Sequence, residues 1–507
     1  MTNKPSVFCK TPVKNLGVTG NLFLTIGTSK SYLKYRIVST LFPRSEERVV
    51  ERLSDDRVSP NEAILPLAFG EYSPRLRYAG RPSLCLRLKE GKQLKAISLT
   101  IGIMSLLLCT FTLTAFCKSH HPRKPAAENG WVGTWGTARQ LVEPNNMPPN
   151  PGLTNNTLRQ VVCVSIGGKK LRLRFSNEFS KSPVTMKIVQ IAVSKGGSSI
   201  DPSTIKTLKF NGKTEVAMDA GSEIVSDALS FNLKPRMEVA ITISFGETSA
   251  TVTGHPGSRT TSYILAGDHT TPDADFTDAA KTDHWYMITG IDVEAPKSTG
   301  AVVVFGDSIT DGRGSGTNKQ NRWPDILAMS LLNNKSTKQT GVLNMGIGGN
   351  AVLKGGLGPT GLNRFEHDVL KQSGVRWLIV FEGVNDLGST RDSTAAFDVA
   401  KGLIEAYGKM IADAHARGIK VYGATITPFK GNNYYRPYRD AARNMINDWI
   451  RARGHFDAVI DFDKTVRDPN DAASLLNEAQ AGANDHLHPN ELGYKMMGEA
   501  VDPALFK

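Results

Sequence analysis

The chain has 507 residues, enough for more than one domain, and a formal net charge of +13. The excess charge lies at one end, because residues 1–124 hold 20 basic and 8 acidic side chains while the other 383 residues hold 41 basic and 40 acidic ones. This distribution gives no support for a nucleic-acid surface on the folded part, so we expect no nucleic-acid partner. Only Cys163 of the five cysteines lies beyond residue 124, which excludes an internal disulfide or a cysteine-ligated metal there.

An uncharged apolar run, residues 96–116, directly follows three lysines near the end of the basic region. At 1.5 Å per residue such a helix would span a hydrocarbon core of about 30 Å, so we predict that residues 96–117 are a signal peptide or a membrane anchor. Cleavage after Ala115, lipidation of Cys117 and retention as an anchor all remain open. Each alternative predicts an exported, bacterial-type protein that is periplasmic, anchored to the cell surface or secreted.

The residues on either side of this run carry less information. Residues 1–95 show no sustained hydrophobic period, and we interpret them as a basic extension that is either disordered or due to an incorrectly assigned start. Residues 118–130 are rich in polar residues and proline, and they are predicted to be a linker.

Residues 131–296 follow an alternating, period-two pattern with turn residues between the apolar runs. This pattern predicts an antiparallel β-sandwich that serves as an accessory domain. The pair Gly167-Gly168 separates the runs 158–166 and 170–176, and we expect a β-hairpin there. This region contains Trp131, Trp135 and Trp285. These tryptophans could stack on sugar rings, but we expect them to pack in the core.

Residues 297–507 alternate apolar strands with amphipathic helical patterns. The alternation predicts a doubly wound α/β domain with a parallel five-stranded sheet. The expected strands are residues 302–305, 342–346, 375–383, 419–429 and 456–462, and the expected helices are residues 322–334, 395–418, 435–454 and 490–501.

Four short motifs follow these elements at the expected carboxyl edge of the sheet, where open α/β sheets bind ligands. They are Gly306-Asp307-Ser308, "NMGIGGN" at 344–350, "GVND" at 383–386 and "DHLH" at 485–488. Acyl transfer needs a nucleophile, a base, an acid that orients the base, and donors for an oxyanion.

Ser308 is the candidate nucleophile, His488 is the candidate base, and Asp485 is the candidate acid that orients the base. The backbone N–H of Ser308, that of a glycine in the second motif, and the Asn385 amide supply the donors. No metal or other cofactor is needed for this chemistry, and none is expected.

The four motifs resemble, in identity and order, those of the SGNH or GDSL hydrolases, a family of serine esterases and lipases. "FGDSITDG" has isoleucine where the family's name has leucine, and the β-rich stretch with "HWYMITGIDV" and "RWPD" resembles the bacterial two-domain members. The resemblance implies a flavodoxin-like sheet and ester hydrolysis through an acyl-enzyme. It also implies an oxyanion hole formed by Ser308, Gly349 and Asn385.

The neighbours of the motif residues are expected to have structural roles. Asp307 should brace the turn before Ser308, and Asp386 should hydrogen-bond the rim. Asn344 and Asn350 are expected to shape the second loop. His486 should be a bystander or contact substrate, and His415 should face solvent.

The acyl group and the alcohol cannot be read from the motifs. An exported two-domain member with a possible sugar-binding module and no visible hydrophobic lid favours a carbohydrate O-acetyl esterase, whose partner would be an acetylated polysaccharide or oligosaccharide. The alternatives are a lysophospholipase or arylesterase that hydrolyses lipid or short-chain esters, and a non-catalytic polysaccharide-binding envelope protein. The run "GIGGNA" (346–351) also fits a dinucleotide-binding pattern, which would indicate an oxidoreductase.

Overall fold

The computed structural model describes residues 23–29, 32–38, 129–482 and 484–507. The chain divides into two compact units, Met1–Thr112 and Leu113–Lys507. In the first unit, β1 (Phe23–Ser29) and β2 (Tyr32–Val38) pair as an antiparallel hairpin. The predicted signal or anchor segment, residues 96–117 with Cys117, lies outside the described residues, as does most of the linker. No helix within the described ranges is both long and apolar enough to cross a membrane.

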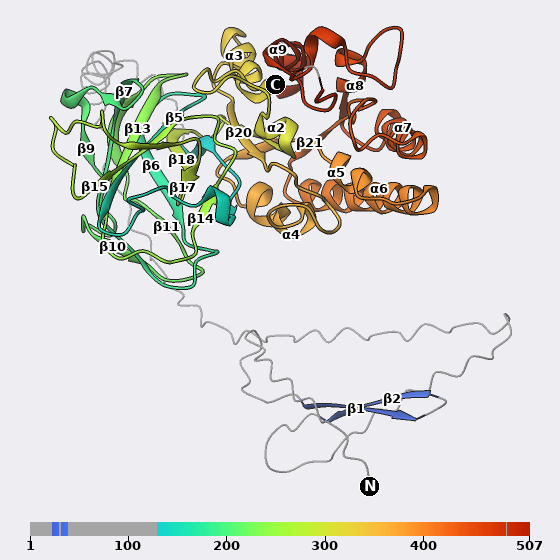
Figure 1. The fold of residues 1–507 in the computed structure, drawn as a ribbon, viewed down its shortest axis with the longest axis horizontal. Helices are drawn as coiled ribbons and strands as arrows, with labels where there is room; N and C mark the ends of the chain where they lie inside the picture. The colour runs from blue at the N-terminus through green and yellow to red at the C-terminus, as the bar shows by residue number, and fades with distance from the viewer. Residues whose placement is uncertain (1–22, 30–31, 39–128, 483) are drawn as a thin grey trace, which may run out of the picture. The chain divides into compact units, whose positions relative to one another are not determined.

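The second unit begins with an antiparallel β domain, seen in cyan and green in Figure 1. One sheet has the strand order β10-β7-β13-β5-β15-β16, a second has the order β11-β6-β18-β3, and β17-β14-β4 form a small third sheet. Apolar residues of both large sheets, such as Val162 and Phe175, belong to one buried cluster. The expected antiparallel β domain is therefore confirmed.

The strands of this domain are short on average. Their bounds are β3 (Asn129–Gly136), β4 (Gln140–Leu141), β5 (Asn156–Cys163), β6 (Gly168–Ser176), β7 (Val184–Gly196), β8 (Ser199–Ile200), β9 (Lys206–Thr207), β10 (Val216–Met218), β11 (Glu223–Val225), β12 (Leu229–Leu233), β13 (Glu238–Phe245), β14 (Thr253–His255), β15 (Ser262–Ala266), β16 (Ala280–Thr282), β17 (Trp285–Tyr286) and β18 (Ile288–Pro296). Single-turn helices η1 (Pro144–Asn146) and η2 (Pro202–Thr204) lie between them.

Two of the three tryptophans of this domain pack in the core as expected. Trp135 and Trp285 are buried and meet edge to face, with their ring centroids 5.0 Å apart. Trp131 is half-buried beneath the guanidinium of Arg172, 4.5 Å from its ring centroid. Trp135 and Trp285 therefore cannot stack on a sugar.

The prediction of a β-hairpin at Gly167-Gly168 is wrong. Strand β5 pairs with β13 and β15, whereas β6 pairs with β11, β12 and β18, so the chain crosses here from one sheet to the other. The glycines serve close packing instead of a hairpin turn. A Cβ on Gly167 would lie 2.5 Å from the carbonyl oxygen of Leu233, closer than a side chain can approach.

The α/β domain contains a parallel five-stranded sheet in the order β20-β19-β21-β22-β23. The strands are β19 (Ala301–Gly306), β20 (Gly341–Gly346), β21 (Val375–Phe381), β22 (Lys420–Ala424) and β23 (Ala458–Ile460). This is the doubly wound, flavodoxin-like order 2-1-3-4-5. The predicted fold class is confirmed.

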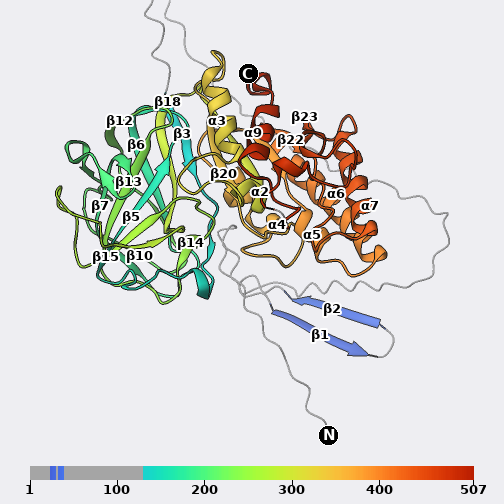
Figure 2. The ribbon, with the colours of Figure 1, turned by 45° about the horizontal axis from the view of Figure 1, so that its top comes forward.

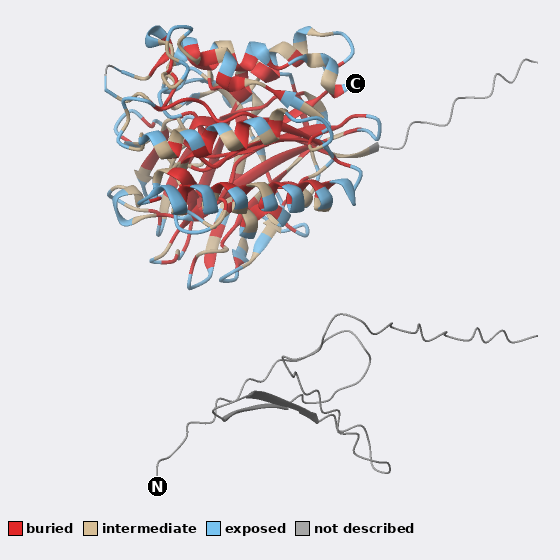
Figure 3. Cartoon of the chain, turned by 90° about the vertical axis from the view of Figure 1, so that its right-hand side faces the viewer, coloured by how far each residue is buried: buried red, intermediate tan, exposed pale blue. Residues whose placement is uncertain are grey.

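Helices cover both faces of this sheet, as Figure 1 shows. Along β19, Val302 and Val304 join the cluster that contains Trp323 of α3 and Met497 of α9. The intervening Val303 joins the opposite cluster, which contains residues of α6 and α7. Both faces of the strand are therefore buried, which explains its continuous apolar sequence. Figure 3 shows the buried strands between helices whose outer sides are exposed.

The helices of the domain are, in chain order, α2 (Ser308–Asp311), α3 (Trp323–Asn333), α4 (Gly361–Phe365), the π-helix η3 (Glu366–Leu370), α5 (Val384–Gly388), α6 (Ser393–His415), α7 (Pro437–Arg451), α8 (Phe462–Val466), η4 (Asn477–Ala479), α9 (Glu491–Ala500) and η5 (Pro503–Phe506).

The β domain and the α/β domain pack directly on each other where β3 meets β20, as the view in Figure 2 shows. The N–H of Gly133 donates to the carbonyl of Ser373 at 2.9 Å, and the N–H of Val342 donates to Ser165 Oγ at 2.9 Å. A Cβ on Gly341 would lie 2.2 Å from the carbonyl oxygen of Gly133. Glycine at this junction therefore allows the two backbones to approach closely.

We predict that Gly341→Ala destabilises the protein by about 1–3 kcal/mol, because the added methyl group has no space at this junction. Gly408→Ala is the matched control. Gly408 is exposed in α6 and a Cβ there would meet no atom within 4 Å, so this change should stabilise by about 0.5–1 kcal/mol. Urea unfolding of both variants measures the difference, and equal stabilities would contradict the packing described.

Candidate active site

Ser308 lies immediately after a buried strand, at the carboxyl edge of the sheet. Strand β19 ends at Gly306, and the Asp307 carboxylate caps α2 by accepting the N–H of Ile309 at 2.9 Å. Gly306 is needed because a Cβ there would lie 2.1 Å from Thr310 Oγ1. Ser308 is the first residue of α2, so its own N–H has no acceptor within the helix and can serve a ligand.

Ser308, His488 and Asp485 form one hydrogen-bonded chain. Ser308 Oγ lies 2.8 Å from His488 Nε2. His488 Nδ1 lies 2.9 Å and 3.0 Å from the two carboxylate oxygens of Asp485. The structure therefore brings together three residues that were predicted from segments 180 positions apart.

The loop that carries Asp485 holds this carboxylate in place. The Asp485 carboxylate accepts hydrogen bonds from the backbone N–H of Leu487 at 3.1 Å and from that of His488 at 2.7 Å. Partial burial opposes ionisation, but the hydrogen bonds from His488 outweigh it and lower the pKa of Asp485 to about 2. The carboxylate is therefore ionised at neutral pH and can orient the imidazole.

Asn385 and Gly349 line the same pocket as Ser308 and His488. Asn385 Nδ2 donates to the carbonyl of Asn350 at 2.8 Å, and the Tyr434 hydroxyl donates to Asn385 Oδ1 at 3.1 Å. An amide nitrogen has two N–H groups, so one remains for a ligand in the pocket. Gly349 has a φ of +70°, in the left-handed region that favours glycine.

Tyr434 was not identified from the sequence. Its ring lies against Gly388, where a Cβ would come within 2.4 Å of it. Because its hydroxyl contacts Oδ1, it fixes which end of the Asn385 amide faces Asn350. The sequence "NNYYRP" carries no signal for this role, since the contact joins this loop to α5, 49 residues earlier in the chain.

The pocket around Ser308 has a volume of about 380 Å³ and both domains line it. Ser308, Gly349, Asn385 and His488 are contributed by the α/β domain. The β domain adds mostly polar side chains, namely Gln140, Glu143, Asn146, Arg259 and His284. The β domain was expected to be an accessory module, and nothing in the sequence indicated this contribution to the pocket.

The β domain also holds the short helix that begins at Ser308. The buried carboxylate of Asp311, at the end of α2, lies 2.8 Å from His255 Nε2 and accepts from Arg259 Nη2 at 3.2 Å. Burial raises the pKa of Asp311, but the contacts with His255 and Arg259 outweigh it and hold that pKa below its usual value. An interdomain ion pair therefore fixes the helix that carries the serine.

The neighbouring polar residues take the structural roles expected from the sequence. Asp307 caps α2, and Asp386 accepts the N–H groups of Val352 and Leu353, each at 2.9 Å. Asn344 Nδ2 donates to the Thr310 carbonyl at 2.9 Å. Asn350 Nδ2 donates within its own loop, to the carbonyls of Leu357 and Pro359.

His486 and His415 lie outside the chain of contacts described above. His486 packs against Gly431, where a Cβ would lie 2.6 Å from the imidazole ring. His415 is 45% exposed, as expected, and lies 2.8 Å from the Asp457 carboxylate.

The dinucleotide pattern at residues 346–351 is not a nucleotide-binding turn. A dinucleotide-binding loop leads directly into a helix whose N-terminus holds the pyrophosphate. Here the loop continues through residue 360, and the next helix, α4, begins at Gly361. The oxidoreductase alternative is therefore wrong.

A serine, histidine and aspartate joined by hydrogen bonds at the carboxyl edge of a flavodoxin-like sheet define the site of a serine hydrolase. Residues 304–496 match the model of the GDSL-like lipase/acylhydrolase family, and this domain belongs to that family of ester hydrolases. No curated protein matches the chain in sequence.

Several solved structures resemble part of the chain. A member of the lipolytic protein G-D-S-L family from Veillonella parvula is 24% identical, with 39% of this chain and 94% of the other covered and a TM-score of 0.30. The lipase/acylhydrolase from Enterococcus faecalis is 22% identical, with 40% and 92% covered and a TM-score of 0.30. The acetyl xylan esterase AlAXEase is 22% identical, with 39% and 96% covered and a TM-score of 0.30.

We predict that His255→Leu lowers the free energy of unfolding by about 1–3 kcal/mol, because it leaves the buried Asp311 carboxylate without one of its hydrogen-bond partners. His415→Leu is the matched control. It breaks an exposed contact between the same residue types and should cost less than about 1 kcal/mol. Denaturant unfolding compares the two variants, and a loss in His255→Leu no larger than in the control would show that Asp311 does not need this partner.

Proposed function

We propose that the chain hydrolyses carboxylic esters through an acyl-enzyme on Ser308. The supporting observation is the continuous chain from Ser308 Oγ through His488 to Asp485, with contacts of 2.8 Å and 2.9 Å. His488 Nε2 takes the proton of Ser308 while Oγ attacks the ester carbonyl carbon. Asp485, ionised at neutral pH, fixes the imidazole tautomer and stabilises the imidazolium.

The tetrahedral intermediate collapses when His488 gives its proton to the departing alcohol. A water molecule then attacks the acyl-enzyme, and His488 again accepts the proton. As the bond between the acyl carbon and Ser308 Oγ breaks, His488 returns this proton to Oγ, and the carboxylic acid is released. The oxyanion in both steps is stabilised by the N–H groups of Ser308 and Gly349 and by the Asn385 amide.

For the substrate we propose an acetyl ester of a carbohydrate. Of the residues that line the pocket, only Pro256, Leu357 and Leu487 have aliphatic side chains. Polar groups of the β domain line part of the pocket, and they match the many hydroxyls of a sugar. A pocket of about 380 Å³ with this lining suits a small acyl group on a polar alcohol.

A longer acyl chain is the second candidate. Leu357 lines the pocket and is 49% exposed, so it offers an apolar surface to an aryl ester or a lysophospholipid. The acyl preference separates the two candidates. A non-catalytic polysaccharide-binding protein is disfavoured because the complete hydrogen-bonded chain would have no use in it.

We further propose export of the protein, on the basis of residues 96–117 in the sequence.

We predict that the purified protein releases acetate from acetyl-xylan and prefers p-nitrophenyl acetate over esters of longer acids. The reason is the small number of apolar side chains in the pocket. Activity profiles across p-nitrophenyl esters of rising chain length, acetyl-xylan and lysophospholipid measure this preference. Faster turnover of long-chain esters or lysolipid would replace the carbohydrate proposal with the lipid alternative.

We predict that Ser308→Ala abolishes p-nitrophenyl acetate hydrolysis, because it removes the nucleophile. We predict that Asp485→Asn lowers kcat by about 10⁴-fold, because the amide favours the wrong tautomer of His488. Asp457→Asn is the matched control, since Asp457 contacts His415 at 2.8 Å well outside the pocket. It should leave kcat unchanged. Near-normal turnover in Ser308→Ala, or equal losses in the two aspartate variants, would refute the assignment.

A further inference from the structure

Arg364, in the short helix α4, is a buried residue that the proposed chemistry does not use directly. Its guanidinium has five N–H groups. They reach five acceptors: Nε donates to Asn350 Oδ1 at 2.9 Å, Nη1 to the Met345 carbonyl at 2.7 Å and Asp368 Oδ2 at 3.0 Å, and Nη2 to the Gly306 carbonyl at 2.9 Å and Glu382 Oε1 at 3.0 Å.

Three of these acceptors lie on the three segments at the carboxyl ends of β19, β20 and β21, which we call the active-site loops. Gly306 precedes Asp307 and Ser308, Asn350 follows Gly349, and Glu382 opens the segment that leads to Asn385. Each loop carries one of the three donors that the proposed oxyanion hole needs. A single rigid group therefore joins the supports of all three donors.

We propose that Arg364 is the positioning residue of the oxyanion hole. This inference rests on the proposed function, because it concerns the donors assigned there. Arg364 does not contact the substrate. It acts by holding the loops of Ser308, Gly349 and Asn385 at fixed separations, so that their N–H groups converge on one point.

Arg364 is connected to Asn385 by two routes. Besides the contact with Glu382, Arg364 holds the side chain of Asn350, whose carbonyl accepts Asn385 Nδ2 at 2.8 Å. The amide of Asn385 is thus anchored through Asn350 on one side and through Tyr434 on the other. Loosening Arg364 would free both the Gly349 loop and this amide.

Arg364 also favours the ionised forms of the buried carboxyl groups near it. Burial raises the pKa values of Asp307 and Glu382, and the Arg364 guanidinium opposes that rise for both groups. Asp368 accepts from Arg364 on one oxygen and from Arg139 of the β domain on the other, at 3.3 Å. The guanidinium is therefore braced from outside the α/β domain as well.

Lysine could keep the charge at this position but could not make the five contacts. An ammonium group has three donors on one nitrogen, whereas the planar guanidinium presents five in a fixed arrangement. Arg364→Lys should therefore keep the buried charge balanced while releasing the three loops. This separates a positioning role from a purely electrostatic one.

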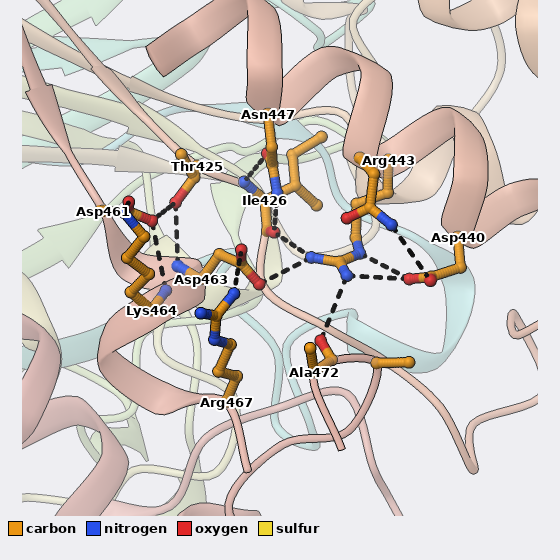
Figure 4. Close-up of polar contacts among 12 residues, drawn as sticks. Thr425, Ile426, Asp440, Arg443, Asn447, Asp461, Asp463, Lys464, Arg467 and Ala472 are labelled. Atoms are coloured by element: carbon orange, nitrogen blue, oxygen red, sulfur yellow. Dashed lines mark hydrogen bonds and ion pairs between the residues drawn. The ribbon is translucent and has the colours of Figure 1, made fainter. Parts of the chain in front are cut away.

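Arg443 offers a matched control in the same domain, and Figure 4 shows its contacts. It is as deeply buried as Arg364 and donates to Asp440, to Asp463 at 2.8 Å and to the carbonyls of Ile426 and Ala472. None of these acceptors adjoins a proposed oxyanion donor. Arg443→Lys should therefore cost stability without changing the chemistry.

The experiment compares Arg364→Lys, Arg443→Lys and Ser308→Ala in the full chain, with circular dichroism and thermal melts to measure the folded fraction. Steady-state kinetics on p-nitrophenyl acetate give kcat and KM, and the rate of inactivation by a serine-trapping phosphonate reports on the oxyanion hole independently. We expect Arg364→Lys to lower kcat on the order of 10- to 100-fold, with KM within about threefold, and to slow inactivation in parallel. Arg443→Lys should keep both rates within about twofold per folded molecule.

A kcat loss in Arg364→Lys no greater than in Arg443→Lys at equal folded fraction would overturn the inference. If Arg364→Lys does not fold, Asn350→Ala replaces it, because it removes the nearest link between the guanidinium and the oxyanion loop. That variant should show the same loss of kcat at constant KM, and an unchanged kcat would overturn the inference. Retained activity in Ser308→Ala would instead refute the proposed function, so the two failures are distinguishable.

Discussion

The whole site depends on the parallel register of three neighbouring strands. Gly306, the last residue of β19, is paired with Gly346 at the end of β20 and with Phe381 at the end of β21. Because these strands run in one direction and end at one level, the loops that follow them emerge side by side. The serine, the glycine loop and the asparagine are neighbours for this reason. His488 completes the group from a loop close to the last helix.

The β domain is part of this site as well as of the shared core. It packs through glycines against β20, and its His255 and Arg259 hold the end of the helix that carries Ser308. It also lines the pocket with polar side chains. We therefore regard it as one wall of the active site. Removing it would leave the Asp311 carboxylate without these partners and would open the pocket on one side.

Local patterns in the sequence were sufficient for the fold class and for the residues that carry the proposed chemistry. Continuous apolar strands such as residues 302–305, helical periods, and short motifs placed after them are properties of neighbouring residues. Partners that depend on distant pairs could not be found in this way. The contacts of Arg364, the pair of His255 with Asp311, and the hydroxyl of Tyr434 on Asn385 each join segments that only the tertiary fold brings together. The prediction of a hairpin at Gly167-Gly168 was wrong because strand pairing also depends on distant segments. A glycine pair allows a close crossing between two sheets as readily as it allows a turn.

The most direct test of the central claim is to identify the nucleophile chemically. The protein is treated with a fluorophosphonate that traps activated serines, digested, and mapped by mass spectrometry. Our account predicts a single phosphonylated peptide with the label on Ser308, and no labelling when His488 is replaced by alanine. Labelling of a different serine, or labelling of Ser308 that does not depend on His488, would contradict the account.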